Sequence, residues 1–97
     1  MAEIRIEGRS VTTESDVHRV LAEQLDLGPW YGRNLAALHD RLSTDVDRPL
    51  RIIWLDSATS RSRLGADLFD DIVAVLRDVA RQDLDLGWVE RFEFELR

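Results

Sequence analysis

The spacing of hydrophobic residues divides the chain into strand-like and helix-like segments. Residues 3–8 alternate charged side chains with Ile4 and Ile6, as a strand with one buried face does, and Gly8 ends this pattern. A nearly unbroken apolar run at 50–55, opened by Pro49, is typical of a strand buried within an α/β sheet. Residues 88–96 alternate again, which predicts a third strand with one face in water.

Three other segments place apolar residues at helical spacing. The first spans residues 13–26, with Thr13 as a candidate N-cap, and Gly28-Pro29 breaks it. The second follows Asn34, a good N-cap, and runs to about residue 45; the third follows Gly65. Residues 56–64 are polar, and we predict a short helix there. The expected buried positions of the three helices are Val17, Val20, Leu21 and Leu25; Leu35, Leu38 and Leu42; and Leu68, Ile72, Val75, Leu76 and Val79.

This order of segments predicts one α/β domain over residues 1–97. Strand, helices, strand, helices and strand together indicate a short three-stranded parallel sheet with helices packed on one side. We find no repeat or linker that would divide the 97 residues. The first residues lack the continuous apolar core of a signal peptide or membrane span, so a cytoplasmic location is expected.

Charge and composition narrow the classes of function. The chain has 19 acidic residues against 13 basic ones, all arginine, and a formal net charge of −6. This balance argues against binding to nucleic acid or anionic membranes and favours basic partners. Six aspartates and two arginines lie between Asp67 and Asp85, which we interpret as a solvated acidic surface. The absence of cysteine excludes disulfides and thiolate metal sites.

Catalytic patterns are missing from the sequence. His18 and His39 lie in no nucleophile or metal motif, and there is no glycine-rich phosphate loop. His39 and Asp40 are adjacent, but neighbouring positions on a helix diverge. The acidic clusters lack the spacing of a calcium loop. We therefore expect no enzyme activity, no metal and no cofactor.

The segment 30–42, WYGRNLAALHDRL, combines features of a protein-binding edge. Two large aromatics, Trp30 and Tyr31, directly precede the second helix. Four positions at helical spacing lie on the side of that helix opposite the leucines. One of them, Asp40, is too far from the N-terminus of the helix to act as a cap. Aromatic and charged groups together are typical of interface anchors. The four positions are Ala36, His39, Asp40 and Ser43.

This segment resembles the barstar family, the intracellular inhibitors of barnase-type ribonucleases. The shared pattern is aromatic-Tyr-Gly-x-Asn-Leu-x-Ala-Leu-x-Asp-x-Leu. Further similarity lies at Asp16-Val17-His18, at Pro49-Leu50 followed by Trp54, and in the apolar run 72–76. The resemblance covers most of the chain. It implies a barstar-like fold and a one-to-one complex with a secreted, guanyl-preferring ribonuclease.

The resemblance also implies roles for residues of the loop and second helix. Asp40 matches the aspartate that fills the phosphate site of the ribonuclease in place of RNA. Trp30 stands where a tyrosine of the family packs over the active-site histidine of the enzyme. Tyr31, Gly32 and Asn34 match the family directly and are expected to shape the loop.

Other positions complete or depart from the family pattern. An acid near the start of the last helix contacts the enzyme in the family, and Asp70 or Asp71 is the best match. Ala36 stands where the family carries a second helix acid, and His39 where it carries a tryptophan, so the target is expected to differ in detail. Ser43 lies on the same helix face. The free protein is expected to be a monomer. Two alternatives stay open: an immunity protein against a toxin that is not a ribonuclease, and an acidic protein-interaction module.

Overall fold

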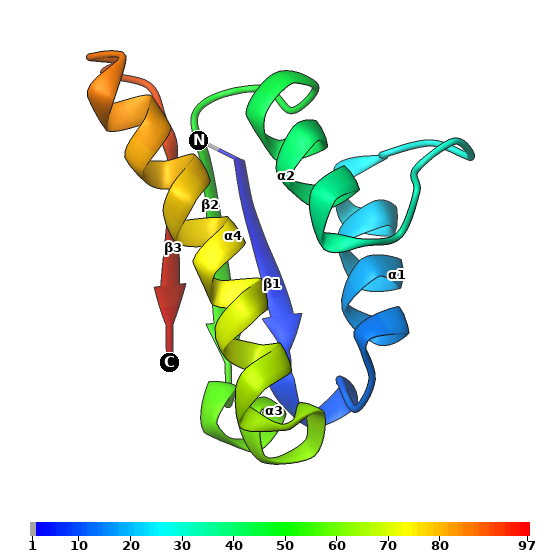
Figure 1. Cartoon of the computed structure of the whole chain (residues 1–97). Helices are drawn as coiled ribbons and strands as arrows, with labels where there is room; N and C mark the ends of the chain where they lie inside the picture. Colours follow the sequence, from blue (N-terminus) through cyan, green and yellow to red (C-terminus); the bar gives the residue numbers. More distant parts are fainter. Residues whose placement is uncertain (1) are drawn as a thin grey trace.

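A computed structural model describes residues 2–97 and shows a three-stranded parallel sheet with helices on one side (Figure 1). The strands are β1 (Ala2–Glu7), β2 (Leu50–Leu55) and β3 (Phe92–Leu96), in the order β1-β2-β3. The helices are α1 (Glu14–Leu25), α2 (Leu35–Thr44), α3 (Ser57–Leu64) and α4 (Ala66–Asp85), and a 3₁₀ turn, η1, covers Gly8–Ser10. This architecture confirms the predicted fold class.

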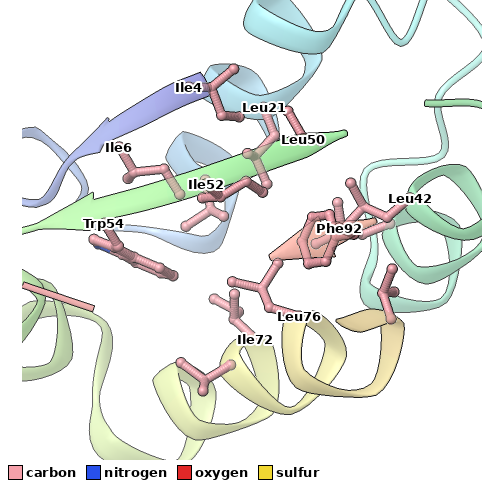
Figure 2. Close-up of a cluster of buried hydrophobic side chains, with 14 of the residues drawn as sticks. Ile4, Ile6, Leu21, Leu42, Leu50, Ile52, Trp54, Ile72, Leu76 and Phe92 are labelled. Carbon is pink, nitrogen blue, oxygen red and sulfur yellow. The ribbon is translucent and has the colours of Figure 1, made fainter. Parts of the chain in front are cut away.

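Alternate residues of each strand face the helices and form the core. In the parallel register, Ile4 of β1 pairs with Ile52 of β2, which pairs with Phe94 of β3. Figure 2 shows Ile52 and Trp54 directed toward Ile72 and Leu76 of α4. The other sheet face carries charged pairs such as Arg51–Glu93 at 3.1 Å. Helices therefore cover one face of the sheet, whereas the other face carries charged side chains, with Ile53 buried between Arg5 and Glu95 in the register.

The helix boundaries follow the predicted capping residues. Thr13 caps α1 by a reciprocal box: its hydroxyl accepts from the Asp16 amide, and the Asp16 carboxylate accepts from the amides of Thr12 and Thr13. Hydrogen bonds donated to the carboxylate, first from the Thr12 amide and next from the Thr12 hydroxyl, lower the pKa of Asp16 from 3.8 to about 2. Asn34 caps α2 by accepting from the Ala37 amide at 2.8 Å. Both predicted N-caps are confirmed.

Two details differ from the sequence-based prediction. The third strand begins at Phe92 rather than at residue 88, because Gly87 adopts a φ of 73° and turns the chain after α4. Trp88 and Val89 consequently lie outside the sheet, and Val89 is 92% exposed. The buried stripe of α4 includes Phe69 and Val73, whereas Leu68 and Val75 of the predicted stripe are only partly buried.

Asp83 was expected on the acidic surface, and this expectation is wrong. Its side chain is buried, and its carboxylate accepts from Arg48 Nε at 2.7 Å and from the Phe92 amide at 2.7 Å. The guanidinium of Arg48 also lies over the rings of Trp88 and Phe92, at 5.9 and 5.8 Å. This ion pair links the end of α4 to the starts of β2 and β3.

Between residues 2 and 97, no helix is both long and apolar enough to cross a membrane.

Candidate protein-binding site

The loop between α1 and α2 projects one aromatic ring into solvent. Leu27 and Tyr31 of this loop are buried in the core, whereas Trp30 between them is 87% exposed. Asp26 and Gly28 both adopt left-handed backbone conformations, which turn the chain sharply out of α1. Two buried anchors on either side of an exposed ring hold Trp30 outward while limiting the movement of the loop.

Tyr31 lies inside the protein rather than on its surface. Its hydroxyl is 2.6 Å from Nδ1 of the buried His18, whose Nε2 is 2.9 Å from a carboxylate oxygen of Glu14. A carboxylate only accepts, so Nε2–H of His18 donates to Glu14, and in the neutral ring Nδ1 then accepts from the phenol of Tyr31. Burial raises the pKa of Tyr31 to about 12. This network anchors the loop through Tyr31 and leaves its ring little surface for a partner.

The loop also packs closely against the start of α2. A Cβ atom at Gly32 would lie 3.2 Å from the Cβ of Ala37, closer than side chains normally approach. Arg41 donates from Nη1 to the carbonyl oxygen of Leu27 at 3.1 Å. Gly32 therefore permits the loop to lie along one flank of α2, and Arg41 fastens it there.

Asp40 lies at the centre of the exposed face of α2. Leu38 and Leu42 are fully buried, and Ala36 and Asp40 point to the opposite, solvent side. Within residues 2–97, no hydrogen bond or ion pair engages the carboxylate of Asp40; the Thr44 hydroxyl donates to the backbone oxygen of Asp40 instead, at 2.8 Å. The carboxylate is thus exposed on a rigid helix and is available to an external cation.

His39 and Ser43 were predicted to lie on that exposed face, but both side chains contact α4 instead. Nε2 of His39 is 2.5 Å from Oδ2 of Asp78, and the Ser43 hydroxyl donates to Oε1 of Gln82 at 3.1 Å. From the first contact to the second, the position rises by four residues on α2 and by four residues on α4. The two helices therefore run roughly parallel (Figure 1). The side chains of His39 and Ser43 therefore form the flank of α2 that faces α4.

The acid that α4 brings beside α2 is Asp78, which the sequence analysis did not select. Asp70 instead pairs with Arg61 of α3 at 3.6 Å, and eight residues of helix separate it from Asp78, about 12 Å along the axis. The structure therefore brings neither Asp70 nor the adjacent Asp71 to the contact between α2 and α4. Asp78 lies two turns after Asp71, so helical spacing could have made it a candidate contact residue. Only the packing of α2 against α4 shows that Asp78 is the acid beside α2.

These side chains define a surface that we call the acidic ridge: Trp30, Ala36, Asp40 and Asp78. Asp40 is central, the loop carrying Trp30 lies on one flank of α2, and Asp78 lies on the other. In the part of the chain that the structure describes, no cluster of three or more potential ligands could hold a metal ion. The ridge offers carboxylates and an aromatic ring to a partner.

Comparison with known proteins agrees with this architecture. Residues 1–95 match the family model described as "Barstar (barnase inhibitor)". A curated relative, "Putative ribonuclease inhibitor YrdF" of Bacillus subtilis (strain 168), is 34% identical over 82 residues, which cover 84% of this chain and 89% of the relative. With the sheet, the helix order and the loop-helix segment in place, the chain belongs to the barstar family.

Proposed function

We propose that this protein inhibits a ribonuclease of the barnase type by inserting the acidic ridge into its active site. The proposal is supported by membership of the barstar family and by the name of the Bacillus relative. The observation that carries it is the exposed carboxylate of Asp40, held on a rigid helix without a partner among the described residues. A ribonuclease must present cationic groups to the phosphates of RNA, and Asp40 offers them a substitute anion.

Asp40 needs several donors from the enzyme to make this exchange favourable. A carboxylate transferred from water into an interface loses its hydration, and the cost is offset only when charged and hydrogen-bonding partners surround it. The phosphate-binding residues of a ribonuclease provide such partners already arranged. Binding therefore requires no covalent step, and occupation of the substrate site is sufficient for inhibition.

Trp30 supplies apolar contact area beside the charged group. Its exposed ring can pack on the enzyme surface and exclude water around the ion pairs, as aromatic anchors do in protein interfaces. Because Leu27 and Tyr31 already fix the loop, little conformational entropy is lost on binding. Trp30 thus contributes binding energy without disturbing the fold.

The arrangement of acids indicates a target that differs in detail from barnase. Ala36 removes one acid from the ridge, and a lost charged hydrogen bond is worth about 1.5–3 kcal/mol. Asp78 supplies an anion from α4 on the flank where His39 replaces a tryptophan. We infer a one-to-one complex with a secreted guanyl-preferring ribonuclease whose cations match Asp40 and Asp78.

Inhibition of a panel of small guanyl-preferring ribonucleases tests the proposal. The unmodified protein should abolish hydrolysis of RNA by its cognate enzyme at a molar ratio of one. Asp40→Ala should raise the inhibitor concentration needed at least a hundredfold, because breaking a desolvated charge pair costs about 3–5 kcal/mol. Asp47→Ala is the matched control, since Asp47 is also exposed but lies beyond the end of α2.

Two results would contradict the proposal. In the first, no ribonuclease of the panel is inhibited while a toxin with another activity is bound, as expected of a different kind of immunity protein. In the second, Asp40→Ala and Asp47→Ala weaken inhibition by the same small factor, so that the position of the carboxylate is irrelevant.

A further inference from the structure

A polar network between α2 and α4 holds one acid of the ridge in place. Oδ2 of Asp78 lies 2.5 Å from Nε2 of His39 and 3.4 Å from Nε2 of Gln82. The amide oxygen of Gln82 accepts from the Ser43 hydroxyl at 3.1 Å. The two halves of this network lie 39 residues apart in the sequence.

The chemistry of the network fixes the proton on His39. A carboxylate is an acceptor only, so Nε2 of His39 carries a hydrogen and donates it to Asp78. The amide of Gln82 donates to the same oxygen. Among residues 2–97, no hydrogen bond or ion pair engages Oδ1 of Asp78 or Nδ1 of His39, and the two side chains are 58% and 30% exposed. Asp78 can therefore bind an external cation through Oδ1, and His39 can take up a second proton at Nδ1.

We propose that His39 positions Asp78 for the ribonuclease and makes the affinity of the complex depend on pH. The inference rests on the proposed function. Neutral His39 orients the carboxylate and leaves its negative charge intact. Protonated His39 turns the hydrogen bond into an ion pair that cancels this charge, so that the ridge offers one anion fewer to a cationic site.

The charged groups around His39 determine the sign of the effect. From α4 the ring meets Asp78 and the neutral Gln82; along α2, Asp40 points to solvent and Ser43 is neutral. Cations of a bound ribonuclease disfavour a protonated His39 ring, because they compete for Asp78 and repel the imidazolium. Binding releases a proton, and the affinity rises with pH.

Comparison of the unmodified protein with His39→Gln between pH 5.5 and pH 8 isolates this effect. Glutamine keeps an N–H donor for Asp78 but does not titrate. At pH 8 the two proteins should bind the same ribonuclease within about twofold. As the pH falls, the unmodified protein should lose affinity faster, by up to tenfold per pH unit once the imidazole titrates, because one proton must be released per complex. All other groups are the same in both series, so their effects cancel in the comparison.

A second measurement follows His39 in the free protein. In nitrogen-15 NMR spectra at pH 8, His39 should carry its hydrogen on Nε2, and Asp78→Ala should weaken this preference because the acceptor is removed. Parallel pH profiles for the unmodified protein and His39→Gln would overturn the inference, as would an unchanged position of the His39 hydrogen in Asp78→Ala. If Asp40→Ala still abolishes tight binding in that case, the proposed function stands; if no ribonuclease is bound at any pH, both fall.

Discussion

Replacing Asp83 by asparagine should remove a large part of the stability of the fold. The Asp83 side chain is 2% exposed, and its carboxylate is shared between Arg48 and the Phe92 amide. Asparagine can still accept from one of these donors, but it leaves the guanidinium of Arg48, itself only 10% exposed, without a counter-charge. Removing one partner of a buried ion pair typically costs about 3–5 kcal/mol.

Other contacts of Arg48 place the expected cost near the lower limit. Its guanidinium also donates to the carbonyl oxygens of Val46 and Leu42, at 2.8 and 2.7 Å, and it lies over the Trp88 ring. We therefore expect a loss of about 3 kcal/mol, out of roughly 5–15 kcal/mol for a domain of this size. The corresponding fall in Tm is about 12–24 °C.

Urea denaturation followed by tryptophan fluorescence measures this loss directly. Asp85→Asn provides the control, because Asp85 is exposed at the end of the same helix and should change the free energy of unfolding by less than about 0.5 kcal/mol. Combining Asp83→Asn with Arg48→Met should cost less than the sum of the single changes, since the uncompensated charge is gone. A loss below 1 kcal/mol for Asp83→Asn, or strict additivity in the double variant, would refute the reasoning.

Three further predictions follow from the capping box, the loop and the charge. Because the pKa of Asp16 is lowered, its contribution to stability is complete above pH 3.8 and is lost as the pH falls through about 2. Between pH 5 and pH 2.5, the free energy of unfolding measured in urea should therefore decrease less for Asp16→Asn than for the unmodified protein. Equal decreases would contradict this prediction. Tyr31→Phe should lower the free energy of unfolding by about 1–3 kcal/mol, because Nδ1 of the buried His18 loses its partner, and a change under 0.5 kcal/mol in chemical denaturation would count against the network. The association rate with the ribonuclease, measured by stopped flow, should fall steeply with salt as the Debye length shortens from ~30 Å at 0.01 M to ~10 Å at 0.1 M, whereas a flat series would exclude electrostatic steering by the acidic surface.

Local patterns predicted the elements of the fold, and long-range contacts decided the details. The caps at Thr13 and Asn34 could be predicted because capping depends on residues three positions apart. The start of β3 was misplaced because the alternation at 88–91 imitates a strand, although these residues form the turn after α4. Alternation shows that one side of an extended segment is more polar than the other, but it does not establish that a neighbouring strand is present.

The candidate site was predicted in part, for the same reason. Exposure of Asp40 follows from its place opposite Leu38 and Leu42 on one helix, a purely local property. The pairing of His39 with Asp78 depends on how α2 lies along α4, which no spacing within α2 reveals. Burial of Asp83 was missed because an aspartate near the end of a helix is usually solvated, and its arginine lies 35 residues earlier.

Competition with a nucleotide tests most directly whether the acidic ridge takes the place of RNA. The dissociation constant of the complex between this protein and its ribonuclease should be measured by calorimetry at increasing concentrations of a guanosine mononucleotide that occupies the enzyme's phosphate site. If Asp40 fills that site, the apparent dissociation constant should rise in proportion to the nucleotide concentration. An affinity that does not change at saturating nucleotide, with protein, enzyme and nucleotide bound together, would contradict the account.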